Sequence, residues 1–464
     1  MRDTVQADEK EIHEECGVFG IYHDNKAASG VYMGLHALQH RGQEGAGIAA
    51  SDGTHLRCYK GKGLLTDVFR PEDLEPLTGN NSIGHVRYGT AGGDEIENVQ
   101  PIVARSGIGS IAVVHNGQIV NSLELKEELE EKGHIFHGSS DSEIILHLIQ
   151  GRKGSLLEKI KAACVRLDGA YTFLILTEKN MYAIRDKNGL RPLALGRCGD
   201  GYCISSETCA FDMVDAEYIR DVEPGEILKL SARGLQSTFY TEERRQNICA
   251  MEYIYFARPD SNIEGLNVHM MRKKTGTILA GKDAELNADM VVGVPDSSLS
   301  AAIGYSEASG LPYEMGLIKN RYVGRTFIQP TQSQRDMGVR LKLSANTSVV
   351  AGKKIVLVDD SLVRGTTSRR IVRMLKEAGA GEVHVRIASP QILYPCFYGV
   401  DTSTREELIS SRMSLEELQS FLHADTLKFL CVEDLQEAYG ETGCCFACFD
   451  GRYATDLYSY GRKK

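Results

Sequence analysis

The chain has 464 residues, of which 42% are hydrophobic and 25% are charged, and these are ordinary proportions for a soluble globular protein. This length favours two domains over a single core. The net charge of −10 does not favour a nucleic-acid partner. No apolar run approaches the roughly 20 residues of a membrane helix. The polar, acidic first residues exclude a secretory signal and an Arg-rich transit peptide. These features predict a cytoplasmic protein without a membrane partner.

The first half of the chain reads as a series of short strands. From Cys16 to about residue 240, apolar and β-branched segments alternate with Gly, Asn and Asp. They are GVFGIY, GIAAS, SIGHVRYGT, SIAVVHNGQIV, AYTFLILT, MYAIRD and YCISSE. Residues 123–132 and 143–148 have a helical pattern. This arrangement predicts layered sheets with flanking helices.

The second half, from about Ile248 onward, has a different rhythm. The strand-like segments MVVGV, KIVLV and EVHVRIA alternate with helical patterns at 300–309 and 368–378, and a further helical pattern covers 414–422. Alternating strands and helices are typical of an open parallel sheet. We expect the domain boundary between Tyr240 and Met251, where the sequence TEERRQN is charged.

The segment IVLVDDSLVRGTT, residues 355–367, suggests a ligand site. An apolar strand ends in Asp359 and Asp360, and a small-residue loop leads into a helix. Loop N–H groups and nearby hydroxyls at a helix N-terminus favour a phosphate. The two carboxylates suit ribose hydroxyls or a metal. Two Asp residues after a strand could also be a plain polar loop, but here they precede Arg-Gly and Thr-Thr without interruption.

This order of residues resembles the phosphoribosyl diphosphate (PRPP) loop of the type I phosphoribosyltransferases. The resemblance implies that PRPP is the ligand, and that one Mg²⁺ per subunit is held by Ser297, Asp359 and Asp360. A second strand-to-helix turn, VVGVPDSSLSAA, matches the family's pyrophosphate turn, although Asp-Ser-Ser is also an ordinary helix cap. The PRPP-binding residues implied in this way are Asp359, Asp360, Ser361, Arg364, Gly365, Thr366, Thr367, Asp296, Ser298 and Lys319.

Residues 319–344 are unusually basic within an acidic protein. A solvated charged face is the usual explanation for such a run. The segment also resembles the mobile loop of the same family, which closes over PRPP and excludes water.

Cys16 is a candidate nucleophile. A polar leader precedes it and a strand-like GVFGIY follows it. If the leader is cleaved between Glu15 and Cys16, the free α-amine can act as the base for its own thiol. An internal Cys before a strand would otherwise need no explanation.

Four further motifs follow in order, LQHRGQEGAGIA, GHVRYGTAG, VHNGQIVN and SSDSE. Together with CGVFGIY they resemble the glutamine amidotransferase domain of the N-terminal nucleophile class, over residues 16–240. The resemblance implies that the Asn116 side chain and the Gly117 N–H stabilise the oxyanion. It also implies that Arg87 binds the glutamine carboxylate, Asp141 binds its ammonium, and Gly42 lines the pocket. Taken singly, NG is a common hairpin turn and SSDSE a common cap.

The twelve Cys residues occur without an export signal, which argues against a disulfide framework. Isolated Cys are most simply small buried hydrophobes. These are Cys58, Cys164, Cys198, Cys203, Cys209 and Cys431. The C-x-x-C pair Cys445/Cys448 could be half of a zinc site or a redox pair. By resemblance to an iron–sulfur branch of the family, Cys249 and Cys396 complete a [4Fe–4S] site. The adjacent Cys444 leaves the ligand at 444 or 445 open, and the x₂ spacing favours Cys445.

As a whole, the chain resembles the glutamine PRPP amidotransferases. The resemblance implies a removed leader (1–15), an N-terminal-nucleophile αββα glutaminase domain (16–245), and a type I phosphoribosyltransferase domain with an open parallel sheet (246–464). The implied reaction is glutamine + PRPP + H₂O → 5-phosphoribosylamine + glutamate + pyrophosphate, the committed step of purine synthesis. A homotetramer or dimer inhibited by purine nucleotides is also implied.

Two alternatives remain at this stage. Another glutamine-dependent synthase would need a sugar-isomerase domain or an SGG-type ATP loop, and we find neither in residues 248–464. A PRPP-binding iron–sulfur regulator without transferase activity would have no need of Cys16, Arg87, Asn116 and Gly117.

Overall fold

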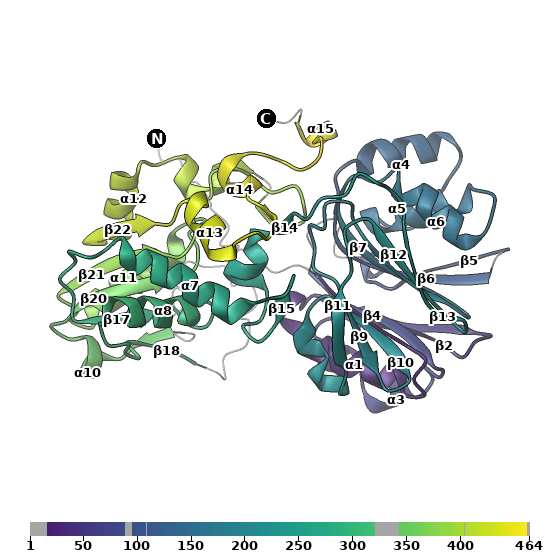
Figure 1. Ribbon diagram of the computed structural model, residues 1–464, viewed down its shortest axis with the longest axis horizontal. Coiled ribbons are helices and arrows are strands. Elements are labelled where there is room, and N and C mark those ends of the chain that lie inside the picture. Colours follow the sequence, from purple (N-terminus) through teal and green to yellow (C-terminus); the bar gives the residue numbers. More distant parts are fainter. Residues whose placement is uncertain (1–15, 89–94, 108, 321–342, 403, 462–464) are drawn as a thin grey trace.

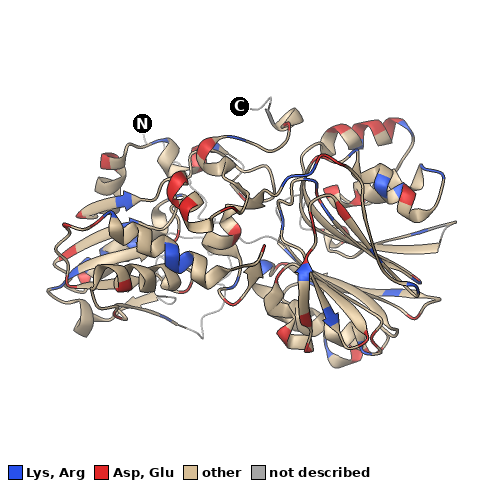
Figure 2. Cartoon of the chain, viewed as in Figure 1, with Lys and Arg blue, Asp and Glu red and all other residues tan. Residues whose placement is uncertain are grey.

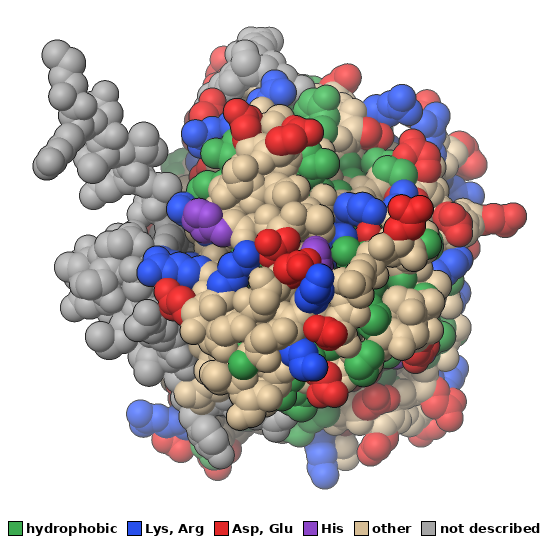
Figure 3. Space-filling model, turned by 90° about the vertical axis from the view of Figure 1, so that its left-hand side faces the viewer, with side chains coloured by type: hydrophobic (Ala, Val, Ile, Leu, Met, Phe, Trp, Pro, Cys, Tyr) green, Lys and Arg blue, Asp and Glu red, His purple; other side chains and the backbone are tan. Residues whose placement is uncertain are grey.

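The computed structural model describes residues 16–88, 95–107, 109–320, 343–402 and 404–461. Two lobes lie side by side, one built from the first half of the chain and one from the second half (Figure 1). Helix α4 (Ser122–Glu131) of the first lobe carries a cluster of acidic residues (Figure 2). On the visible face of the second lobe, acidic and basic side chains are interspersed (Figure 3).

The first lobe contains two antiparallel sheets. The seven-stranded sheet has the order β11-β9-β10-β1-β4-β2-β3, and the six-stranded sheet has the order β13-β12-β8-β7-β6-β5. The strands of the first sheet are β1 (Gly17–Tyr22), β2 (Gly45–Ser51), β3 (Leu56–Lys62), β4 (Asn81–Arg87), β9 (Ala194–Cys198), β10 (Gly201–Ser205) and β11 (Glu217–Asp221). Those of the second are β5 (Ile102–Ser106), β6 (Gly109–Ile119), β7 (Gly169–Thr177), β8 (Met181–Arg185), β12 (Glu226–Ser231) and β13 (Gly234–Phe239).

Helices cover the outer faces of both sheets. Helix α1 (Ala27–Ala37) packs on the first sheet, and α4 (Ser122–Glu131), α5 (Ile144–Gln150) and α6 (Leu156–Cys164) pack on the second. The short α2 (Leu65–Val68) and α3 (Pro71–Leu74) follow β3. Between the sheets lies a fully buried apolar layer that includes Val18, Ile83, Val114 and Leu174. Burial of both sheet faces explains the apolar strands, and the predicted αββα arrangement is confirmed.

The second lobe is built on a parallel sheet of order β17-β20-β21-β22. Its strands are β17 (Met290–Gly293), β20 (Lys354–Asp359), β21 (Glu382–Ile387) and β22 (Thr426–Phe429). Its longer helices are α7 (Val268–Gly281), α8 (Leu299–Ser309), α11 (Thr366–Glu377), α12 (Leu415–Leu422) and α13 (Val432–Tyr439). The predicted open parallel sheet is confirmed, whereas β22, α7 and α13 were not predicted from the sequence.

Several short elements complete this lobe. They are β14 (Ile248–Cys249) paired with β23 (Cys444–Cys445), β15 (Asn262–Ile263) with β16 (Leu266–Asn267), β18 (Leu317–Lys319) with β19 (Leu343–Ala345), and the helices α10 (Thr347–Val350), α14 (Ala447–Asp450) and α15 (Tyr458–Gly461). The pair β18–β19 joins the two ends of the basic segment 319–344. The interior of that segment, 321–342, lies outside the described residues, as does the leader 1–15.

Two cysteine predictions are wrong. Cys58 and Cys431 are exposed, whereas Cys164, Cys198, Cys203 and Cys209 are buried as expected. Cys58 lies on β3, which is the edge strand of its sheet and is covered less well than the central strands. Cys431 precedes α13, where its thiol donates to the Asp434 carboxylate at 3.0 Å. In the described part of the chain, no helix is long and apolar enough to cross a membrane.

Candidate active sites

The first candidate site lies where strands of the two facing sheets end. Cys16 directly precedes β1, and Arg87 ends β4, which pairs with β1 in the register Gly17↔Val86. Asn116 lies near the end of β6 in the opposite sheet. Residues two apart on a strand share a face, so Cys16 lies on the face of Val18 and Asn116 on that of Val114. Because Val18 and Val114 both belong to the layer between the sheets, Cys16 and Asn116 face the same space.

The half-buried Cys16 thiol contacts the backbone of Tyr88. Its Sγ atom lies 3.5 Å from both the nitrogen and the carbonyl oxygen of Tyr88. Burial raises the pKa of the thiol to about 11, although the Tyr88 hydrogen bond and the Arg87 charge partly oppose that effect. The charges of Asp141 and Glu44 raise it further. The neutral thiol therefore dominates at neutral pH, and a nucleophilic Cys16 needs a base.

Asn116 and Gly117 have the properties of an oxyanion site. Asn116 is fully buried, and among the described residues neither its Nδ2 nor its Oδ1 has a hydrogen-bond partner. Buried polar groups are normally paired, so an unpaired amide beside a thiol points to a ligand partner. Gly117 has φ = +130°, and a Cβ there would lie 2.1 Å from the carbonyl oxygen of Ala170. Only glycine fits at that point of the strand.

The remaining two glutaminase candidates lie against the same strands. Asp141 accepts a hydrogen bond from the Ile119 N–H at 2.8 Å, which ties it to the end of β6. A Cβ at Gly42 would lie 2.6 Å from backbone carbons of Val86 and Arg87, so Gly42 touches the end of β4. The charges of both Arg87 and Asp141 act on the Cys16 thiol. The structure thus brings the six predicted residues of this site to one end of the sandwich.

The second candidate site lies at the carboxyl edge of the parallel sheet. Asp359 ends β20, and Asp360 follows it. Strand β17 pairs with β20 in the register Gly293↔Val358, which brings the turn after β17 to the same edge. Ser297 donates to the Asp360 carboxylate, and Ser298 donates to Asp359 at 3.3 Å. The two turns therefore share one set of carboxylates and hydroxyls.

Asp359 and Asp360 are buried like charges. Burial, and then the neighbouring Asp360 charge, raise the pKa of Asp359 to about 7. Burial also raises the pKa of Asp360, which the hydrogen bonds from Ser297 and Ser361 partly offset. A bound cation, or hydroxyl groups that donate hydrogen bonds, would stabilise the ionised form of such a pair.

The loop after the acidic pair opens helix α11. Gly365 has φ = +71°, and Thr366 and Thr367 are the first residues of this twelve-residue helix. Ser361 donates to the Asp360 carboxylate at 2.7 Å. The guanidinium of Arg364 instead pairs with the carboxylate of Glu407 at 3.0 Å.

Lys319 connects the basic segment to the other turn of this site. Its Nζ atom lies 2.5 Å from the carboxylate of Asp296. Both side chains are about half exposed or more, at 48% and 69%. Lys319 is the last residue of β18, so the start of the segment 319–344 lies at the turn that contains Asp296.

Four thiols line a third site, a small cavity that Leu190, Ile392 and Tyr398 also line. They are those of Cys249, Cys396, Cys445 and Cys448. Burial raises the pKa of Cys448, and the neighbouring Cys249, Cys396 and Cys445 raise it further. Cys444 is not among the residues that line the cavity. Within the described ranges, no three His, Cys, Asp or Glu side chains are close enough to hold one metal ion.

Other residues at these sites carry no clear signal in the sequence. The Ser368 hydroxyl, in the first turn of α11, donates to the Asp359 carboxylate at 3.0 Å. Its position directly after Thr366-Thr367 is the one signal in the sequence that could have identified it as a site residue. Tyr88 acts through its backbone, which no sequence pattern reveals.

Comparison with known proteins identifies one domain in each lobe. A family model for the glutamine amidotransferase domain matches residues 86–213, and one for the phosphoribosyl transferase domain matches 267–389. The chain is 57% identical over 461 residues to the amidophosphoribosyltransferase of Bacillus subtilis (strain 168), covering 97% of this chain and 96% of that protein. It is 50% identical to the Staphylococcus aureus (strain MRSA252) enzyme, covering 97% and 92%.

Solved structures show the same similarity. The B. subtilis glutamine PRPP amidotransferase, solved in complex with ADP and GMP, superposes with a TM-score of 0.91 at 56% identity, over 96% of this chain and 98% of that chain. A structure described as the allosteric regulatory enzyme of purine biosynthesis gives 0.92 at 56% identity, over 96% and 97%. The chain therefore belongs to the amidophosphoribosyltransferase family, as an enzyme of purine biosynthesis with a glutamine amidotransferase domain and a phosphoribosyltransferase domain.

Proposed function

We propose that the site around Cys16 releases ammonia from glutamine. The Cys16 thiolate attacks the side-chain amide, ammonia leaves, and water hydrolyses the glutamyl thioester to glutamate. Asn116 Nδ2 and the Gly117 N–H stabilise the oxyanion, Arg87 binds the α-carboxylate, and Asp141 binds the α-ammonium. Gly42 lines the pocket. The unpaired, fully buried amide of Asn116 is the observation that carries this assignment.

The base in this scheme is the α-amine of Cys16. Burial holds the thiol protonated, and Arg87 stabilises a thiolate only in part. Removal of residues 1–15 would create an amine with an ordinary pKa of about 7.7–8.0 on the same residue. We therefore propose a mature chain that begins at Cys16, with a glutaminase domain at 16–245 and a phosphoribosyltransferase domain at 246–464.

The second site is proposed to bind PRPP at the edge of the parallel sheet. The loop from Ser361 to Thr367, with Gly365 and Thr366, binds the 5-phosphate at the start of α11, and Asp359 and Asp360 bind the ribose hydroxyls. Arg364 is expected to contact the same ligand from this loop. At the other turn, Asp296, Ser298 and Lys319 lie where the pyrophosphate would be. Ammonia attacks the anomeric carbon, the carbon–oxygen bond breaks, and pyrophosphate leaves.

Mg²⁺ fits the residues of this second site. A buried carboxylate pair with a raised pKa and an adjacent hydroxyl is a hard-oxygen set that favours a divalent cation. Ser297, Asp359 and Asp360 would hold one ion per subunit. When bound, it would neutralise charge on the pyrophosphate leaving group.

A [4Fe–4S] cluster fits the cavity lined by thiols. A single Zn²⁺ would bring four thiolates to about 2.3 Å from one point, whereas within the described ranges no three His, Cys, Asp or Glu side chains are close enough to hold one metal ion. Cys249, Cys396, Cys445 and Cys448 would hold the cluster, with Cys445 rather than Cys444 as ligand. Its role would be structural, because these residues belong to neither reacting site and connect three distant chain segments.

Further proposals concern inhibition by nucleotides, assembly of subunits and the path of ammonia. The B. subtilis relative was solved with ADP and GMP, so we propose that purine nucleotides inhibit this chain. We further propose a homotetramer or dimer, and an enclosed passage for ammonia between the two sites. Sedimentation of the protein with and without each nucleotide, alongside activity, tests the proposals on inhibition and on assembly.

The two half-reactions can be separated by experiment. Ammonia added as a salt bypasses the first site, so Cys16→Ala should lose glutamine-dependent synthesis and keep ammonia-dependent synthesis of phosphoribosylamine. Loss of both activities in a folded variant would contradict the assignment of Cys16.

A further inference from the structure

Arg41 is a buried cation beside the proposed nucleophile. It ends the short helix Gln39–Arg41 and is fully buried. Its Nε donates to the carbonyl oxygen of Cys16 at 3.4 Å. Arg41 thus contacts the backbone of Cys16, whereas Tyr88 contacts its sulfur.

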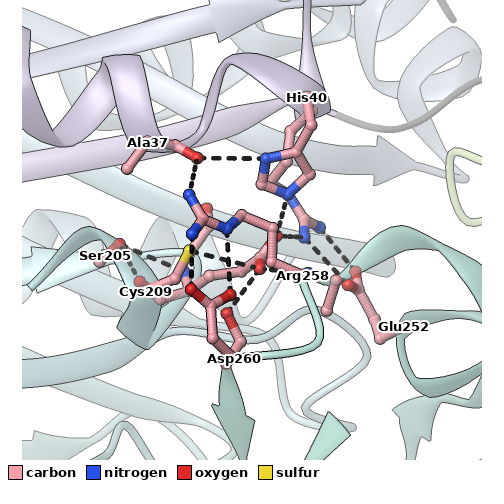
Figure 4. Close-up of polar contacts among 12 residues, drawn as sticks. Ala37, His40, Ser205, Cys209, Glu252, Arg258 and Asp260 are labelled. Carbon is pink, nitrogen blue, oxygen red and sulfur yellow. Dashed lines mark hydrogen bonds and ion pairs between the residues drawn. The ribbon is translucent and has the colours of Figure 1, made fainter. Parts of the chain in front are cut away.

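A carboxylate from the other lobe holds this guanidinium. Glu252 is also fully buried, and it opens the π-helix Glu252–Phe256 (η6). Its two oxygens accept from the two terminal nitrogens of Arg41, at 2.7 Å and 3.0 Å. Figure 4 shows the Glu252 side chain with dashed lines that mark its polar contacts. The Nη1 atom of Arg191 also lies 3.4 Å from the Oε1 atom of Glu252.

Glu207, from the first lobe, contributes differently. It accepts from one terminal nitrogen of Arg41 at 2.5 Å, and also from His40 at 2.7 Å and from Ser261 at 2.7 Å. A single contact to one nitrogen leaves a guanidinium free to rotate, whereas a bidentate pair fixes its plane. Glu252 therefore sets the direction of the Arg41 Nε–H bond, and Glu207 mainly balances the charge.

The helix that carries Glu252 is anchored toward the second site. Arg272 donates to the carbonyl oxygens of Tyr253 and Ala257, at 2.6 Å and 2.8 Å. Arg272 and Asp360 line one small cavity together with Tyr253. The short helix that begins at Glu252 is therefore bonded to Arg272, which lines a cavity together with Asp360 of the second site.

We propose that Glu252, although it belongs to the phosphoribosyltransferase lobe, is a positioning residue for the glutaminase reaction. It orients Arg41, and Arg41 holds the carbonyl of Cys16 so that the thiol is aimed at the amide of glutamine. This inference rests on the proposed role of Cys16. Glutamine itself is bound by other groups, Arg87 and Asp141, so Glu252 acts on the rate and not on substrate binding.

The test is the variant Glu252→Gln in the full-length, processed protein. Gln keeps the shape and one acceptor but removes the charge and the second acceptor. A misplaced nucleophile should lower kcat for glutamate release roughly 10- to 100-fold. The KM for glutamine should change by less than about threefold, because its binding groups are intact. Ammonia-dependent synthesis should stay at the wild-type rate, since it does not use Cys16.

Glu226→Gln is the matched control. Glu226 is another buried carboxylate, 1% exposed, that accepts from both terminal nitrogens of an arginine, Arg220, at 2.7 Å and 2.8 Å. Its carboxylate also accepts from the Glu223 N–H and the Ser237 hydroxyl, and neither residue belongs to a candidate site. The control should keep the wild-type kcat for glutamate release. If it lost that activity to the same extent as Glu252→Gln, a general cost of breaking a buried ion pair would explain both, and the proposal would be overturned.

A second variant covers the case in which Glu252→Gln does not fold. Arg41→Lys keeps a cation between the two carboxylates but lacks the Nε–H donor, so it should show the same kcat loss with normal ammonia-dependent synthesis. A wild-type glutaminase kcat in either folded variant, or equal loss of both activities, would overturn the proposal. If wild-type protein and Cys16→Ala released glutamate equally, the proposed function itself would be wrong, not the role of Glu252.

Discussion

The Sγ atom of Cys16 lies 3.5 Å from both the backbone nitrogen and the backbone oxygen of Tyr88. One partner can donate to a thiolate, whereas the other can only accept from a thiol. The site can therefore hold the sulfur in both protonation states. Because burial raises the pKa of the thiol to about 11, the thiol is the resting state, and activity depends on an added base.

We predict that glutaminase activity depends on leader removal and on pH. A chain that begins at Cys16 should show kcat/KM for glutamine rising with pH up to about 8, as its α-amine becomes neutral and able to accept the thiol proton. Chains that retain residues 1–15 should lack this activity but keep ammonia-dependent synthesis. Mass spectrometry of the amino terminus, with glutamate release measured across pH, checks this. Equal activity of the two forms would exclude the α-amine as base.

Asn116→Ala should lower kcat for glutamate release by about 10²–10³-fold, the usual effect of losing an oxyanion donor. Its KM for glutamine should change little, because the donor acts mainly on the transition state. The melting temperature should not fall much, since within the described part of the chain the Asn116 amide makes no hydrogen bond that would be lost. A strongly destabilised variant would show instead that this amide is structural.

Asp359→Asn should raise the melting temperature of the ligand-free protein and abolish ammonia-dependent synthesis. The pKa of Asp359 is raised from 3.8 to about 7, so the folded protein binds this proton more tightly than the unfolded chain does. The stabilisation by the protonated form is therefore lost as pH rises through about 7. Without ligand at pH 8, the Asn variant should melt at a higher temperature than the wild type, and near pH 4 the difference should shrink.

The same variant should lose ammonia-dependent synthesis and should gain no thermal stability from PRPP with Mg²⁺, which should stabilise the wild type. Basal glutamate release should persist. A variant that still melted higher with PRPP and Mg²⁺ would remove Asp359 from the proposed ligand site.

Adjacent cysteines allow a matched test of the cluster. Cys445→Ser should lower bound iron and sulfide, because Cys445 lines the cavity, and Cys444→Ser should leave both unchanged. Iron and acid-labile sulfide analysis of anaerobically purified proteins, with the visible absorbance of the cluster, gives the comparison. The reverse pattern would assign the ligand to Cys444, and zinc in both proteins would argue against a cluster.

Much of the fold could be predicted from the sequence because many of its strands are rich in apolar and β-branched residues. Residues 354–358 and 382–388 were predicted as strands; the first segment lies in β20, and β21 covers all of the second except Ala388. Strand β22 was missed because its four residues, TLKF, are too short for a period to stand out. Helix α7 was missed because its apolar positions are broken by Lys, Thr and Gly.

The candidate sites were less evenly predictable. Motif residues such as Asp359 and Asn116 lie at or near the ends of strands and were proposed from the motifs that contain them. Glu252 and Glu207 were not, because their contact with Arg41 spans 211 and 166 positions and depends on how the lobes pack. A buried charge carries no local pattern, since its partners are set by tertiary structure. The x₂ spacing favoured Cys445 over Cys444, but only the structure shows that Cys445 lines the cavity and that Cys444 is not among its lining residues.

Glutamate release from glutamine, with and without PRPP and Mg²⁺, tests the central claim of two coupled sites most directly. We predict that PRPP with Mg²⁺ strongly stimulates glutamate release in processed, anaerobically purified protein, and that Asp360→Asn removes the stimulation but not the basal rate. Equal rates with and without PRPP and Mg²⁺ would contradict the coupling of the two sites.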